Sequence, residues 1–139
     1  MVAIVVGTHG DFARELVRTS EMILGEKENI TSVALEPGDS ADDLVAKYKR
    51  SIESLDTTDG IVFITDLFGG SPYNAACKLA ITNDKIGVVA GVNLSMVLEV
   101  LTLQDASVEK IIEVAQIAGK EGIIAFNSRD IMNHEEEDL

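Results

Sequence analysis

The chain opens with a short run of apolar residues that constrains its fold more than any other segment does. Residues 2–6 (VAIVV) are mostly β-branched, too few for a helix, and do not alternate with polar residues. Such a run is typical of a strand that is covered on both faces, as in the centre of a parallel sheet. Residues 7–10 (GTHG) predict a turn, and apolar residues with helical spacing predict a helix over residues 11–24.

The same alternation of strand and helix patterns continues along the chain. Short β-rich segments recur at residues 30–35, 60–65, 86–90 and 122–126, and helical periodicity recurs at residues 41–55, 72–82, 94–103 and 108–118. Five strands separated by helices predict an α/β fold with a flavodoxin-like, doubly wound sheet. In the strand order 2-1-3-4-5, strands 1 and 3 are neighbours at the point where the winding reverses.

His9 and Asp66 follow the first and third of these strands. Because the carboxyl ends of adjacent parallel strands meet at one edge of a sheet, the two side chains are expected side by side. One ring nitrogen of a histidine can accept a phosphoryl group when the other carries the proton, and a carboxylate that accepts this N–H fixes the tautomer. Taken alone, His9 could be an incidental turn residue, but its pairing with Asp66 favours a reactive histidine.

Glycines lie near both residues at the starts of predicted helices. Gly10 precedes the first helix, and Gly69, Gly70 and Ser71 lead into another, with Ser71 as the expected N-cap and Pro72 as the first helical residue. Backbone N–H groups at a helix amino end bind phosphate oxygens, and glycine lets the backbone approach closely. Alone, the GGSP segment indicates only a helix start. Beside the predicted histidine and carboxylate it indicates a phosphate-binding site.

Composition excludes several classes of function. The net charge of −13, from 24 acidic and 11 basic residues, argues against a nucleic-acid partner, whose binding depends on Lys and Arg. This charge suits a basic protein partner, although solubility alone also accounts for it. No apolar run approaches the roughly 20 residues that cross a bilayer, and no basic leader is present, so a cytoplasmic protein is expected. The sequence indicates no metal site, and no metal role is expected for His134.

Three segments, VVGTHGDFA, ITDLFGGSPYNAA and VVAGVNLSMVLE, occur in this order along the chain. In sequence and spacing they resemble the IIA domain of the mannose-family sugar phosphotransferase system, which includes the mannose, fructose and sorbose types. The resemblance runs over nearly the whole chain to residue 126. It implies a IIA domain over residues 1–126, followed by an acidic C-terminal tail or linker remnant over residues 127–139.

The resemblance implies that the protein is a phosphocarrier. His9 would take a phosphoryl group from phospho-HPr and pass it to a IIB domain during phosphoenolpyruvate-dependent sugar uptake, with the membrane components IIC and IID involved indirectly. Asp66 matches the family's partner of the active histidine, and Ser71 matches its GGSP serine near the phosphoryl group. No cofactor is implied. Whether IIB is a separate polypeptide or follows the tail is left open.

The resemblance also refines the expected fold. It implies four parallel strands in the order 2-1-3-4, with residues 122–126 forming a fifth edge strand that is exchanged across a homodimer. The chain departs from the family at Leu67 and Phe68, where many members have Trp after Thr. We expect this difference to alter the surface that meets protein partners and to leave the phosphoryl chemistry unchanged.

The alternative is a flavin- or nucleotide-binding domain of the same topology. It predicts a phosphate loop rich in Ser, Thr and Gly after the first strand, and aromatic residues around a bound ring. The chain has no G-x-G-x-x-G segment, no Trp and an aromatic content of 4%. A receiver domain of the response-regulator type is also disfavoured, because residues 4–6 include no acidic residue.

Overall fold

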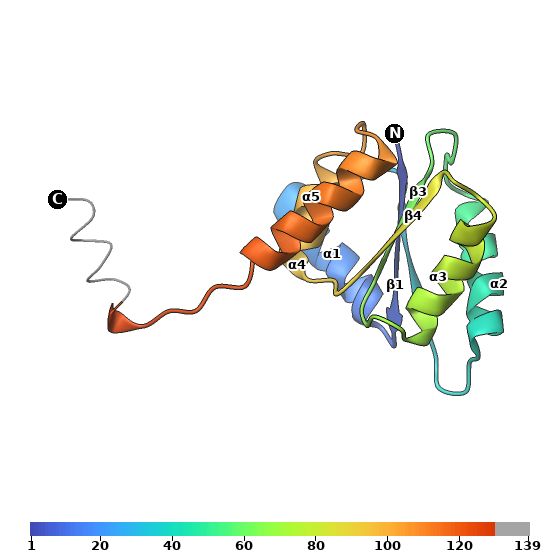
Figure 1. The fold of residues 1–139 in the computed structure, drawn as a ribbon, viewed down its shortest axis with the longest axis horizontal. Coiled ribbons are helices and arrows are strands. Elements are labelled where there is room, and N and C mark those ends of the chain that lie inside the picture. Colours follow the sequence, from blue (N-terminus) through green and yellow to red (C-terminus); the bar gives the residue numbers. More distant parts are fainter. Residues whose placement is uncertain (130–139) are drawn as a thin grey trace.

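A computed structural model describes residues 1–129, in which a parallel sheet lies between two layers of helices (Figure 1). The strands are β1 (Ala3–His9), β2 (Ile30–Leu35), β3 (Ile61–Thr65) and β4 (Ile86–Ala90), and the helices are α1 (Phe12–Leu24), α2 (Ala41–Ile52), α3 (Ser71–Ile81), α4 (Leu94–Leu101) and α5 (Val108–Glu121). All strand pairs are parallel, in the order β2-β1-β3-β4. The predicted α/β class and strand order are confirmed. Within the described residues, no helix is long and apolar enough to span a bilayer.

Each face of the sheet packs against its own set of helices. Val2, Ile4 and Val6 belong to the core formed with α1, α4 and α5, whereas Ala3 and Val5 belong to the core formed with α2 and α3. Successive side chains of a strand point to opposite faces, so the part of the chain that is covered on both faces, residues 2–6, has to be apolar at every position. The unbroken run at the start of the sequence therefore follows from the central place of β1, with helices on both sides (Figure 1).

β1 is longer than the sequence predicts. The expected turn at residues 7–10 was wrong for its first three residues, because Gly7, Thr8 and His9 pair with residues 33–35 of β2. Thr8 Oγ1 accepts a hydrogen bond from Ala13 N at 2.7 Å and so caps α1, since Asp11 makes no side-chain cap bond. β1 therefore carries His9 as its last residue, at the carboxyl edge of the sheet.

α5 also extends beyond its predicted end. The helix passes through Gly119, where a Cβ atom would lie 2.9 Å from Cε of Met96 on α4. The glycine thus permits close packing between two helices and does not end one.

Residues 122–126 form no strand in the single chain. The segment leaves the domain after α5 (Figure 1), with Ile123, Ile124 and Phe126 exposed. Its predicted pairing belongs to a dimer, so one chain does not test it. Most of the predicted acidic tail, including His134, lies outside the described residues.

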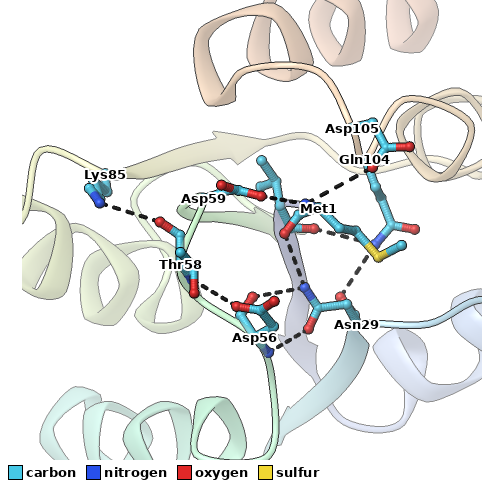
Figure 2. Close-up of polar contacts among 9 residues, drawn as sticks. Met1, Asn29, Asp56, Thr58, Asp59, Lys85, Gln104 and Asp105 are labelled. Carbon is cyan, nitrogen blue, oxygen red and sulfur yellow. Dashed lines mark hydrogen bonds and ion pairs between the residues drawn. The ribbon is translucent and has the colours of Figure 1, made fainter.

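A polar cluster joins the loops at the opposite, amino edge of the sheet (Figure 2). Asn29 has a positive φ of 59°, and its side chain donates to Asp56 O at 2.8 Å and accepts from Asp56 N at 2.7 Å. The buried Gln104 amide donates to Glu28 O at 2.9 Å, and the amino group of Met1 pairs with Asp59. These contacts hold the amino edge together, at the end of the strands opposite to His9.

Candidate active site

The carboxyl edge of the sheet brings the predicted histidine and carboxylate into contact. His9 ends β1, Asp66 follows β3, and the two strands are hydrogen-bonded neighbours. His9 Nδ1 lies 2.8 Å from Asp66 Oδ2, and the backbone N–H of His9 donates to the same oxygen at 3.0 Å. The juxtaposition predicted from strand order is therefore present, and two bonds to one oxygen fix the histidine ring relative to its own backbone.

Asp66 is held in its charged form. Its Oδ1 accepts a hydrogen bond from Leu67 N at 2.9 Å. Burial pushes the pKa of the Asp66 carboxyl upward, but the hydrogen bonds from the backbone and ring of His9, together with the Leu67 amide, outweigh it and lower the pKa below its ordinary value. An ionised carboxylate can only accept hydrogen bonds. It follows that His9 Nδ1 carries the ring proton.

This tautomer leaves the lone pair on Nε2 of His9. The histidine side chain is 50% exposed, whereas that of Asp66 is only 16% exposed. The carboxylate is therefore sheltered behind a ring that remains accessible. The sequence left open which ring nitrogen reacts, and the contact with Asp66 points to Nε2.

The start of α3 lies against the ring. Gly70 is the N-cap of α3 and Ser71 is its first residue, so the predicted N-cap role of Ser71 was wrong. A Cβ atom at Gly70 would lie 3.2 Å from His9 Cε1 and 3.2 Å from Leu67 O. Only glycine leaves the ring and the loop undisturbed at this distance. The first N–H groups of a helix have no intrahelical partner, so α3 brings unpaired donors to the edge where His9 lies.

The other two predicted phosphate-binding glycines serve the backbone conformation. Gly10 and Gly69 have φ values of 56° and 79°, which residues other than glycine rarely adopt. The N–H of Gly10 donates to Leu35 O at 2.9 Å, and that of Gly70 donates to Leu67 O at 3.0 Å. The amides of Gly10 and Gly70 therefore already have hydrogen-bond partners, and the N–H groups of the first turn of α3 are left as donors for an anion.

Exposed apolar side chains follow both His9 and Asp66 in the chain. Phe12, Leu67 and Phe68 are 47%, 61% and 79% exposed, and Phe68 packs on Tyr73 with a ring-centroid distance of 5.1 Å. A groove of about 460 Å³ runs from Asp66 past Phe68 and Tyr73 to β4. The sequence analysis singled out Leu67 and Phe68 as a departure from the family that alters the surface facing protein partners, and both side chains are exposed. Two consecutive large apolar residues in a loop were the signal for an exposed contact surface.

Among residues 1–129, no three His, Cys, Asp or Glu side chains are grouped so that they could hold a metal ion.

Comparison with known proteins assigns the chain to a family. The model of the family described as "PTS system fructose IIA component" matches residues 3–116. The mannose-specific EIIAB component of Escherichia coli K12 is 39% identical over 132 residues, covering 94% of this chain and 41% of that protein. The chain thus spans about two fifths of the length of this relative. The sorbose-specific EIIA component of Lacticaseibacillus casei is 32% identical over 140 residues, covering 100% of both chains.

A solved structure agrees with these matches. The EIIA component from Streptococcus agalactiae superposes with a TM-score of 0.82 at 27% identity, covering 91% of this chain and 98% of that one. The family match, the relatives and the fold agree with one another. The chain belongs to the IIA components of the mannose family of the sugar phosphotransferase system.

Proposed function

We propose that His9 accepts a phosphoryl group from phospho-HPr and passes it to a IIB domain during phosphoenolpyruvate-dependent sugar uptake. One observation carries this proposal: the 2.8 Å contact between His9 Nδ1 and Asp66 Oδ2, with the ring half exposed. Family membership supports the phosphocarrier role in general. The partners and the direction of transfer are inferred from the resemblance of the sequence motifs.

The transfer step uses the free nitrogen of the ring. The Nε2 lone pair attacks phosphorus, the P–N bond to the donor breaks, and the donor nitrogen leaves with the bond's electron pair. His9 becomes positively charged as the new P–N bond forms, and Asp66 stabilises that charge through Nδ1–H. Transfer to IIB reverses these events: the bond from phosphorus to Nε2 breaks, and His9 returns to its neutral form.

The phosphoryl oxygens are bound by the start of α3. The first N–H groups and the amino end of a helix favour an anion. Ser71 supplies the first helical N–H and a hydroxyl, Gly69 provides the positive φ that turns the loop, and Gly70 lets this turn approach His9. Gly10, the residue after His9, contributes through its backbone conformation.

Protein partners dock on the apolar surface around His9. Phe12 lies three residues after His9, Leu67 and Phe68 follow Asp66 directly, and all three side chains are exposed. A phosphoryl group that passes between two proteins has to be shielded from water, and an apolar rim supplies that shield. Phospho-HPr and IIB would use this rim in turn, since each must reach the same Nε2 atom.

The functional unit is proposed to be a homodimer. β4 is an edge strand with an unpaired side, and the exposed segment with Ile123, Ile124 and Phe126 has the apolar character of a strand. Exchange of residues 122–126 would cover both features in the partner subunit. Light scattering at micromolar concentration should give twice the mass of one chain, and a monomeric mass would contradict the exchange.

Incubation with phosphoenolpyruvate, enzyme I and HPr tests the phosphocarrier role. We expect one phosphoryl group per chain, labile in acid and stable in alkali, as for a P–N bond. His9→Ala should abolish incorporation while keeping a cooperative thermal melt. Incorporation that persists in this variant would show that another residue accepts the group.

A further inference from the structure

Tyr48 lies behind the candidate site, in a place that the proposed phosphoryl transfer leaves without a role. It sits on α2, has no exposed surface and is among the largest fully buried side chains. Its ring packs on Phe63 of β3 with a centroid distance of 4.8 Å. The ring accounts for its place in the core, but a phenylalanine would fill that place equally well. The hydroxyl requires a separate explanation.

The hydroxyl group joins two elements that build the site. It donates a hydrogen bond to Pro72 O at 2.9 Å, in the first turn of α3. On its other side lies Gly7, where a Cβ atom would be 2.0 Å from the hydroxyl oxygen and 2.7 Å from Cζ. β1 thus has glycine at a position where any side chain would collide with Tyr48.

Gly7 is two residues before His9 on the same strand. Side chains two apart on a strand point to the same face, so the tyrosine oxygen occupies the position next to the His9 ring on β1. Pro72 follows Ser71 and Gly70, and Gly70 lies against that ring. The hydroxyl therefore spans the gap between the strand that carries the nucleophile and the helix turn that faces it.

Tyr48 remains protonated, as this role requires. Burial raises the pKa of its hydroxyl well above the ordinary value, and the nearby negative charge of Asp66 adds to the rise. The group is therefore a hydrogen-bond donor throughout the physiological range, and Pro72 O is its acceptor.

We propose that Tyr48 is a positioning residue for phosphoryl transfer, because its hydroxyl sets the separation between the end of β1 and the first turn of α3. It thereby holds Gly70 and Ser71 at the distance from His9 that a phosphoryl group needs. This inference rests on the proposed function of His9. The rate of group transfer depends on placing the reacting groups to within about 1 Å. Loss of the Tyr48 hydroxyl should therefore lower the transfer rate more than it lowers the stability of the fold.

The test compares Tyr48→Phe with Ser20→Ala. Ser20 is a matched control because its hydroxyl is also fully buried and donates to a helix carbonyl, Leu16 O, at 2.8 Å, but it lies in the third turn of α1. Loss of one buried hydrogen bond should lower Tm by roughly 2–6 °C in both variants. Only Tyr48→Phe should slow phosphoryl transfer from phospho-HPr, by roughly tenfold.

A spectroscopic readout separates positioning from stability. The amide resonances of Gly70 and Ser71 should shift on phosphorylation in the wild type and in Ser20→Ala, and the shift should be reduced in Tyr48→Phe. Equal rates and equal amide shifts in the two variants would overturn the role of Tyr48 while leaving His9 as the acceptor. A wild-type protein that takes no phosphoryl group on His9 would overturn the proposed function, and the role of Tyr48 with it.

Discussion

Asp66→Asn removes the charge that supports His9 and keeps the size of the side chain. In the wild type, Oδ2 accepts two hydrogen bonds from His9, and Oδ1 accepts one from Leu67 N–H. Asparagine has one accepting oxygen and one donating NH2 group. If its oxygen faces His9, the NH2 group opposes Leu67 N–H. If its oxygen faces Leu67, the NH2 group opposes the backbone N–H of His9 and donates to Nδ1, which moves the ring proton to Nε2 and blocks the nucleophile.

The size of the effect follows from the geometry. At the 2.8 Å that separates Nδ1 from Oδ2, two unit charges attract by about 1.5 kcal/mol in water and by about 6 kcal/mol at an effective dielectric constant of about 20. The ring is half exposed and the carboxylate is mostly covered, so an intermediate loss of about 2–3 kcal/mol is reasonable. This loss falls on the step in which the ring becomes positive. The transfer rate should therefore fall roughly 30- to 150-fold.

Rapid-quench measurement of label passing from phospho-HPr to the protein gives this rate directly. Asp42→Asn is the matched control, because it removes the same charge from an exposed carboxylate that pairs with Lys78 at 2.9 Å. The control should keep its rate within a factor of two or so, since exposed ion pairs contribute little. If Asp66→Asn transferred as fast as this control, Asp66 would have no part in the mechanism.

Three further predictions follow from particular contacts. Gly70→Ala places a Cβ atom 3.2 Å from the His9 ring and should slow transfer roughly tenfold, with little change in stability to urea. An unchanged rate would show that the ring can move aside without loss of activity. Asn29→Ala removes the hydrogen bonds to Asp56 at the amino edge and should cost about 2–3 kcal/mol in urea unfolding without slowing transfer; a slower rate would couple the two edges. The pKa of Asp66 is lower in the folded state than in the unfolded state, so its contribution to stability is present above about pH 4 and is lost as the pH falls further. The urea midpoint should therefore drop more in the wild type than in Asp66→Asn between about pH 5 and pH 3. Parallel midpoints would contradict the depressed pKa.

The sequence predicted those parts of the fold that depend on local pattern. The unbroken apolar run at residues 2–6 identified β1 as a central strand, and the strand order of doubly wound sheets then placed β3 next to it and His9 beside Asp66. Both inferences need only the period of apolar residues and the order of the strands. This explains why the pair could be predicted before any contact was known.

Features that depend on distant segments were mispredicted or missed. Gly119 has the usual properties of a helix stop, but its lack of a side chain serves packing on Met96 of another helix. The N–H of Gly10 has the place of a phosphate ligand, but β2 already supplies its acceptor. Tyr48 lies within the helix predicted over residues 41–55, but its hydroxyl acquires a role only where α2, β1 and α3 meet. Local pattern carries none of this information.

The attachment site of the phosphoryl group tests the account most directly. Protein labelled with ¹⁵N in its histidine rings, phosphorylated through phospho-HPr, should show by NMR a phosphorus-coupled Nε2 of His9, with Nδ1 still protonated and bonded to Asp66. Attachment at Nδ1 would mean that the contact with Asp66 breaks during transfer. Attachment to any other residue, or none, would contradict the assignment of His9 as the acceptor.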